Sequence, residues 1–127
     1  MAVAGSPRLI FVDDEPDILY TIRTGLSRLF NFRVDTFASP STALSTFEAR
    51  KYDFALLDIH MPEMDGFALA RQLLKIDHNL TICFLSGVRN IEESFAREFP
   101  ELSADHLLGK PVGLNDLSIA IHKLLRL

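Results

Sequence analysis

Short apolar runs alternate along the chain with longer stretches in which apolar residues recur every three to four positions. A short apolar run bounded by turn residues is typical of a buried strand, and the longer spacing is typical of an amphipathic helix. Residues 33–37 instead alternate apolar and polar positions, which favours a strand at the edge of a sheet. The pattern predicts strands over residues 8–12, 33–37, 54–57, 81–85 and 106–108.

The longer stretches predict a helix after each strand. Pro16 suits the first turn of the first helix, and Asn31 suits its end. Ser39 and Pro40 form an N-cap and a first turn for a second helix, which we expect to run to Ala49. In the first helix, the stripe expected to face the core is Ile18, Ile22, Leu26 and Leu29. The other helices are expected to start near Gly66, to span residues 91–99, and to bury Leu114, Leu117, Ile121 and Leu124.

The alternation of five strands with five helices predicts an α/β fold, a parallel sheet with helices on both faces. Right-handed crossovers restrict the topology, and the strand order 2-1-3-4-5 of a flavodoxin-like doubly wound domain places the first and third strands side by side. We expect one folded domain over residues 8–127, preceded by a flexible lead-in over residues 1–7.

The composition narrows the function classes. The 127 residues carry a net charge of −4 with no basic stripe, which argues against direct nucleic-acid binding. No apolar run approaches the roughly 20 residues that span a bilayer, so we expect no membrane segment. The single cysteine, Cys83, excludes an internal disulfide and suits a reducing compartment such as the cytoplasm. We expect its side chain to be a small buried hydrophobic group.

Polar side chains follow the apolar runs where four of the predicted strands end. They are Asp13 and Asp14 after the first, Asp58 after the third, Ser86 after the fourth and Lys110 after the fifth. A carboxylate buried without a partner is costly, so we expect Asp58 to lie just past its strand. Ligands of open parallel sheets bind outside the carboxyl ends of the strands, near the point where the strand order reverses. The sequence therefore predicts that these groups converge on one pocket.

Several carboxylates in one pocket repel one another unless a cation lies between them. Mg²⁺ (or Mn²⁺) is the hard cation that suits carboxylate and phosphate oxygens. Lys110 offers a point charge to a phosphate oxygen, and Ser86 offers a hydroxyl group. A carboxylate can itself be a nucleophile that forms an aspartyl phosphate. Asp58 is the best candidate for this nucleophile because it is central and isolated in the sequence, whereas Asp13 and Asp14 are better placed as metal ligands.

One ordered set of motifs runs through the chain: Asp13-Asp14, Asp58, Met61-Pro62, Asp65-Gly66, Ser86 and Lys110-Pro111. Each motif is common by itself. Together, in this order and on this alternation of strands and helices, they resemble the CheY-like receiver domain of two-component response regulators. The resemblance covers nearly the whole chain, from Arg8 to Leu127.

The resemblance implies a phosphoacceptor signalling domain, which is no enzyme beyond catalysing its own phosphorylation and dephosphorylation. Asp58 is expected to receive a phosphoryl group from a histidine kinase or a histidine phosphotransfer protein. Asp14 and Asp58 are expected to bind Mg²⁺ directly, His60 through its backbone carbonyl, and Asp13 through a water molecule.

The resemblance also implies how the signal is passed on. Lys110 and Ser86 are expected to contact the phosphoryl group, and the bond before Pro111 is expected to be cis. The face made by the fourth helix, fifth strand and fifth helix would bind an output domain or protein. Relatives usually carry Tyr or Phe three residues before the lysine, where this chain has Leu107. Leucine has no ring to swing between exposed and buried rotamers, so we expect a weakened or altered switch.

Other interpretations stay open. A degenerate receiver would only bind a partner, although the acidic set and Lys110 argue against it. An aspartyl-phosphate phosphatase usually has a second acid two residues after the nucleophile, where this chain has His60. A flavodoxin-like cofactor binder is disfavoured because the acidic loop after the first strand repels a cofactor phosphate.

Glu15 is either a charge at a helix N-terminus or a residue that supports the metal ligands. The chain fits both a stand-alone regulator and a piece of a longer protein.

Overall fold

The computed structural model describes residues 5–127, so the first four residues of the predicted lead-in lie outside the described range. Within the lead-in, Pro7 is buried, and the backbone N–H of Arg33 donates to its carbonyl oxygen at 2.9 Å. The pairing of the first two strands therefore continues back to Pro7.

A single five-stranded sheet has the order β2-β1-β3-β4-β5, and every neighbouring pair is parallel. This confirms the predicted strand order and the edge position of the second strand. β3 and β4 are buried almost throughout, as a central strand with both faces covered must be. The strands are β1 (Arg8–Val12), β2 (Arg33–Phe37), β3 (Phe54–Asp58), β4 (Thr81–Ser86) and β5 (Leu107–Gly109).

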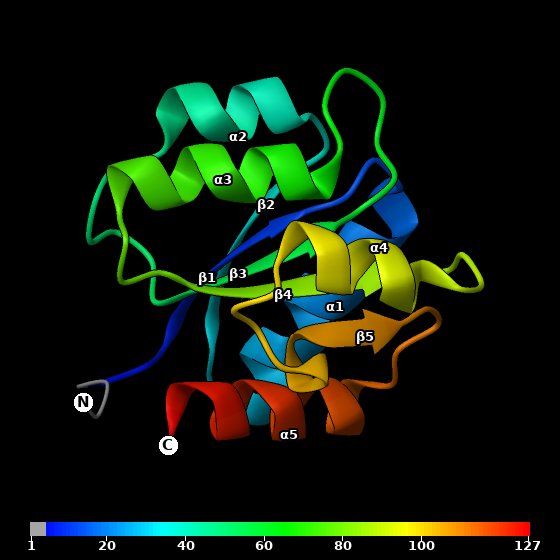
Figure 1. Cartoon of the computed structure of the whole chain (residues 1–127). Helices are drawn as coiled ribbons and strands as arrows, with labels where there is room; N and C mark the ends of the chain where they lie inside the picture. Colours follow the sequence, from blue (N-terminus) through cyan, green and yellow to red (C-terminus); the bar gives the residue numbers. More distant parts are fainter. Residues whose placement is uncertain (1–4) are drawn as a thin grey trace.

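Helices cover both faces of the sheet (Figure 1). The helices are α1 (Pro16–Phe30), α2 (Pro40–Thr46), α3 (Gly66–Ile76), α4 (Ile91–Glu98) and α5 (Leu114–Leu125), with a 3-10 turn η1 (Ala104–His106) before β5. One hydrophobic cluster packs α2, α3 and α4 on one face, and a second packs α1 and α5 on the other. Alternate residues of β1 divide between them, with Ile10 in the first and Phe11 in the second.

Local capping explains where several helices begin and end. The Ser39 hydroxyl accepts from the Thr42 N–H, and the Asp65 carboxylate accepts from the Ala68 N–H. Asn31 closes α1 in the left-handed conformation, with φ of 58°. These ends agree with the positions that the sequence indicates.

Two helix predictions are wrong in detail. α2 ends at Thr46 and not at Ala49, because Phe47 turns extended and stacks its buried ring on Tyr52 at 6.0 Å between centroids. In α1 the predicted core residues Ile22 and Leu26 are buried, but so is Leu19, which lies outside the predicted stripe, while the predicted core residue Leu29 is 67% exposed. The apolar stripe therefore turns away from the sheet at the last turn of α1.

The start of α3 lies directly against the end of β3. The Gly66 N–H donates to the Ile59 carbonyl oxygen at 2.8 Å, and a Cβ atom on Gly66 would overlap the backbone of Asp58 and Ile59. Only a glycine allows this approach, so Gly66 fixes the position of the loop that follows Asp58.

We predict that Gly66→Ala lowers the free energy of unfolding by about 2 kcal/mol, because the methyl group must displace backbone and not a flexible side chain. Urea denaturation measures the change. Gly109→Ala is the matched control, since nothing lies within 4 Å of a Cβ atom there. Equal losses of stability in the two variants would contradict the close-approach argument.

Candidate functional site

The predicted site residues gather at the carboxyl edge of the sheet. Asp13 follows β1, Asp58 is the last residue of β3, Ser86 is the last residue of β4, and Lys110 follows β5. Because all five strands are parallel, these ends lie on the same edge. Asp58 belongs to its strand and is only 3% exposed, so the expectation that it lies past the strand is wrong.

Three carboxylates converge at this edge. Oxygen atoms of Asp13, Asp14 and Asp58 all lie within 4.8 Å of one another. Asp13 is fully buried and Asp58 is buried, whereas Asp14 is exposed. The site thus combines a closed inner side with an open side through which a ligand can enter.

The ammonium group of Lys110 lies among carboxylates. Its Nζ atom is 2.9 Å from Asp13 Oδ2, 3.1 Å from Glu15 Oε1 and 3.4 Å from Asp58 Oδ2. The backbone N–H of Lys110 donates to the Ser86 carbonyl oxygen at 2.8 Å, which ties the end of β5 to the end of β4. The Lys110–Pro111 peptide bond is cis.

Burial disturbs the ionisation of all three central groups. It raises the pKa of Asp58 to about 6, with repulsion from Asp13 adding to the rise and Lys110 opposing it. Burial also raises the pKa of Asp13 against the opposing effect of Lys110. For Lys110, burial lowers the pKa, but hydrogen bonding to Asp13 and Glu15 outweighs it and the pKa is raised. The metal-free site therefore disfavours its own negative charge.

Ser86 is at the site but is turned toward its own loop. Its buried hydroxyl oxygen accepts from the Val88 N–H at 3.1 Å. His60 is exposed, and the His60 backbone N–H is one of the groups that lower the pKa of Asp58. The structure thus places both residues beside Asp58, with the Ser86 hydroxyl group engaged elsewhere.

The sequence left the role of Glu15 undecided. The structure brings its carboxylate to Lys110, 95 positions along the chain. The run Asp13-Asp14-Glu15 signals a concentration of acids, but only the tertiary fold shows which of them meets the lysine.

The residues fit a divalent cation. Asp13 is fully buried, and its Oδ2 atom forms an ion pair with Lys110 Nζ at 2.9 Å. One lysine charge faces the carboxylates of Asp13, Asp14, Asp58 and Glu15, so negative charge remains in excess. A hard cation that binds oxygen ligands would balance this excess negative charge.

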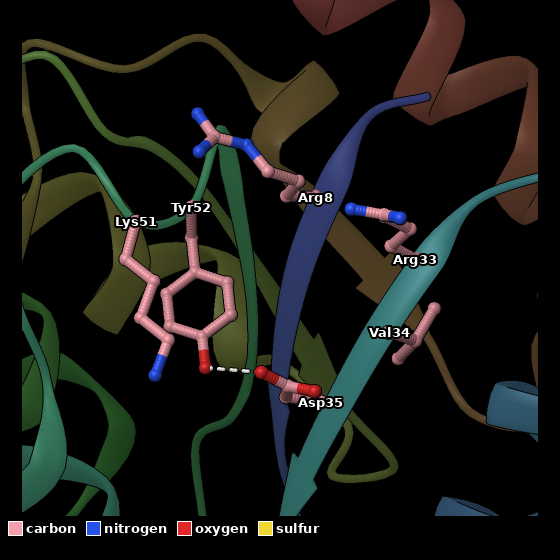
Figure 2. A pocket seen from close by; sticks show the side chains of 6 residues that line it. All are labelled: Arg8, Arg33, Val34, Asp35, Lys51 and Tyr52. Carbon is pink, nitrogen blue, oxygen red and sulfur yellow. Dashed lines mark hydrogen bonds between the residues drawn. The ribbon is translucent and has the colours of Figure 1, made fainter. Parts of the chain in front are cut away.

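A second hollow lies at the opposite end of the sheet (Figure 2). Its volume is about 480 Å³, and it is lined by Arg8, Arg33, Val34, Asp35, Lys51 and Tyr52. Most of its polar groups already have partners: Arg8 pairs with Asp53 at 3.1 Å, and the Tyr52 hydroxyl donates to Asp35 at 2.6 Å. This hollow is at the amino ends of β1 and β2, away from the carboxylate cluster.

The comparison with protein families decides which family the fold belongs to. The model of the response regulator receiver domain matches residues 9–122. The chain belongs to this family. It is therefore a receiver domain of the kind used in two-component signalling, which is a signalling module and not an enzyme in the usual sense.

Curated relatives agree with this assignment. The transcriptional regulatory protein PrrA of Mycobacterium tuberculosis is 35% identical over 121 residues, which cover 95% of this chain and 51% of PrrA. This receiver domain thus spans about half the length of that relative. The response regulator receiver protein CpdR of Brucella abortus is 30% identical over 118 residues, covering 93% of this chain and 96% of CpdR.

Solved structures agree as well. A CheY-like receiver domain protein from Methanospirillum hungatei superposes with a TM-score of 0.84 at 26% identity, covering 96% of this chain and 95% of the other. The non-phosphorylated HemR receiver domain from Leptospira biflexa gives a TM-score of 0.82 at 25% identity, covering 96% of each chain. Within residues 5–127 of this receiver domain, no helix has the length and apolar character needed to cross a membrane.

We predict that Asp58→Asn stabilises the metal-free receiver domain at neutral pH. Burial raises the pKa of Asp58 from 3.8 to about 6 in the folded state, so ionising Asp58 costs the folded protein free energy. The stability that the protonated side chain gives at low pH is therefore lost as the pH rises through about 6. The variant should gain on the order of 2 kcal/mol at about pH 7.5 and almost nothing at about pH 4.

Urea denaturation in the presence of a chelator, at both pH values, measures this gain. Asp17→Asn removes the same charge from an exposed position in the first turn of α1 and is the control. A gain at Asp58 that does not change with pH would contradict the burial argument.

Proposed function

We propose that this receiver domain accepts a phosphoryl group on Asp58 in a Mg²⁺-dependent phosphotransfer reaction. The observation that carries the proposal is the meeting of three carboxylates and one lysine at the carboxyl edge of the sheet, with the ammonium group 3.4 Å from Asp58. The donor is a phosphohistidine on a histidine kinase or a histidine phosphotransfer protein.

In this mechanism an oxygen atom of Asp58 attacks the phosphorus atom. The new P–O bond forms as the P–N bond to the donor histidine breaks, and the imidazole leaves with the electron pair and takes up a proton. Lys110, 3.4 Å from Asp58, neutralises charge on the transferred group. Mg²⁺, when bound, shields the phosphoryl oxygens so that an anionic nucleophile can approach them.

The residues proposed to hold Mg²⁺ are Asp14 and Asp58 directly, the backbone carbonyl of His60, and Asp13 through a water molecule. The convergence of oxygen atoms of Asp13, Asp14 and Asp58 within 4.8 Å of one another supports this set. Protons compete with a cation for carboxylates, and the pKa of Asp58 of about 6 makes that competition relevant near neutral pH.

The proposed signal is a shift between two conformations. A phosphoryl group adds about 1.5 to 2 negative charges and three acceptor oxygens. The Ser86 hydroxyl group accepts from the Val88 N–H and keeps its own O–H to donate, so a hydrogen bond to the phosphoryl group would draw Ser86 and the loop between β4 and α4 toward Asp58. The face of α4, β5 and α5 would carry this change to an output domain or protein, with no nucleic-acid contact by the receiver itself.

The proposed setting is the cytoplasm. Cys83 is fully buried, and burial raises the pKa of its thiol to about 12, so it is the inert hydrophobic residue expected from the sequence.

The alternative, a degenerate receiver that only binds a partner, predicts that neither Mg²⁺ nor a phosphodonor binds.

We predict that incubation with acetyl phosphate and Mg²⁺ adds the mass of one phosphoryl group to the wild type. Asp58→Ala should gain no mass, because the nucleophile is lost. Intact mass spectrometry gives the result, and Asp17→Asn, which removes an exposed acid of α1, should gain mass as the wild type does. A wild type that gains no mass would favour the degenerate receiver.

We predict that Mg²⁺ raises the melting temperature at about pH 7.5 and raises it less at about pH 5.5, since protons compete for the carboxylates. Asp14→Asn should remove most of this increase, while Asp17→Asn should keep it. Scanning calorimetry with and without Mg²⁺ measures the shifts. An Asp14→Asn variant with a full response would contradict the proposed ligand set.

We predict that the missing aromatic ring at position 107 limits the response of the output face. Leu107 is half-buried, pairs in register with Phe84 and packs against the hydrophobic cluster that joins α2, α3 and α4 to the sheet. Amide NMR with beryllofluoride and Mg²⁺ should show smaller shifts in α4, β5 and α5 for the wild type than for Leu107→Tyr. Equally large shifts in both proteins would show that the ring is not needed.

A further inference from the structure

The ammonium group of Lys110 is shared among three carboxylates, and the proposed phosphoacceptor is the farthest of them. The distances from Nζ are 2.9 Å to Asp13, 3.1 Å to Glu15 and 3.4 Å to Asp58. The contacts to Asp13 and Glu15 have the length of charge-assisted hydrogen bonds, whereas 3.4 Å is long for a hydrogen bond to Asp58. Glu15 therefore orients the lysine as well as attracting it.

Local structure does not account for Glu15. It is the N-cap residue of α1, yet its side chain makes no capping hydrogen bond, and glutamate is not among the residues that cap well. Its carboxylate also lies outside the cluster formed by Asp13, Asp14 and Asp58. What the side chain does instead is reach across the site to Lys110.

We propose that Glu15 is a positioning residue that holds Lys110 in the unphosphorylated arrangement and releases it when Asp58 carries a phosphoryl group. This inference rests on the proposed function, because it concerns how the same lysine is supplied to the phosphoryl group.

The number of donors on the lysine makes the contacts compete. An ammonium group has three N–H donors, and in this structure three carboxylates surround it. A phosphoryl oxygen on Asp58 takes a new position beside the lysine, so Nζ must move to meet it, and its contact to Asp13 or to Glu15 lengthens. Release of Lys110 from either acid would leave that acid without its cation.

Burial decides which contact weakens. The side chain of Asp13 is fully buried, and separating a buried carboxylate from its cation is costly. The side chain of Glu15 is 58% exposed, so water replaces the lysine there at little cost. Glu15 is therefore the partner that Lys110 leaves, and its charge favours the resting arrangement by a modest amount.

Three variants separate position from charge. Glu15→Gln keeps the length of the side chain and removes its charge. Glu15→Asp keeps the charge and shortens the side chain by one methylene group, which withdraws the carboxylate from Lys110. Asp17→Asn is the matched control, because it removes one negative charge from the first turn of the same helix at an exposed position.

The first measurement is the NMR signal of the Lys110 ammonium group in the metal-free protein. It should shift in both Glu15 variants and stay unchanged in Asp17→Asn. The second is the affinity for beryllofluoride in the presence of Mg²⁺. Both Glu15 variants should bind it about two- to fivefold more tightly than the wild type, which is the range for a half-exposed ion pair. Asp17→Asn should bind it as the wild type does.

The inference is overturned if the Glu15 variants bind beryllofluoride no more tightly than the wild type. It is also overturned if Asp17→Asn reproduces the gain of Glu15→Gln, because net charge alone would then explain the effect. A wild type that binds no beryllofluoride overturns the proposed function, and the inference falls with it. If the wild type binds beryllofluoride and the Glu15 variants bind it equally well, the inference alone is overturned.

Discussion

The burial of two carboxylates beside one ammonium group is the interaction on which the rest of this structure depends. Asp13 and Asp58 lie inside the protein, where an unpaired negative charge is costly, and Lys110 reaches both of them. One positive charge does not balance two buried acids, so burial raises the pKa of Asp58 to about 6. Such a site gains from a divalent cation, and under the proposed function Asp58 would be the nucleophile and Lys110 would neutralise the phosphoryl group.

The scaffold around this pair has closer local contacts on one side than on the other. β3 is fully buried, and the close approach of Gly66 fixes the chain just after Asp58. At the other side, Asn90 precedes α4 with φ of 61°, and its side chain makes no capping hydrogen bond. The far end of α4 is held by Arg71, whose guanidinium group lies 3.7 Å above the ring of Phe99. A change at Ser86 is therefore expected to move the start of α4 more than its end.

The sequence predicts the strands, their order and the converging polar groups because apolar runs ending in polar residues carry that information locally. It fails where tertiary contacts decide. Phe47 ends α2 early because it stacks on Tyr52, which no local pattern reveals. Leu29 follows the helical spacing but lies where α1 no longer contacts the sheet. The partner of Glu15 is 95 positions away, so only the fold identifies it.

The most direct test of this account is an NMR titration of the aspartate carboxyl carbons in the metal-free protein, with the Asp58 signal assigned by its absence in Asp58→Asn. Burial and repulsion from Asp13 predict a midpoint for Asp58 at a pH of about 6, which should fall when Mg²⁺ is added. A metal-free midpoint at the ordinary value of 3.8 would show that the buried acids are already balanced and would contradict the account.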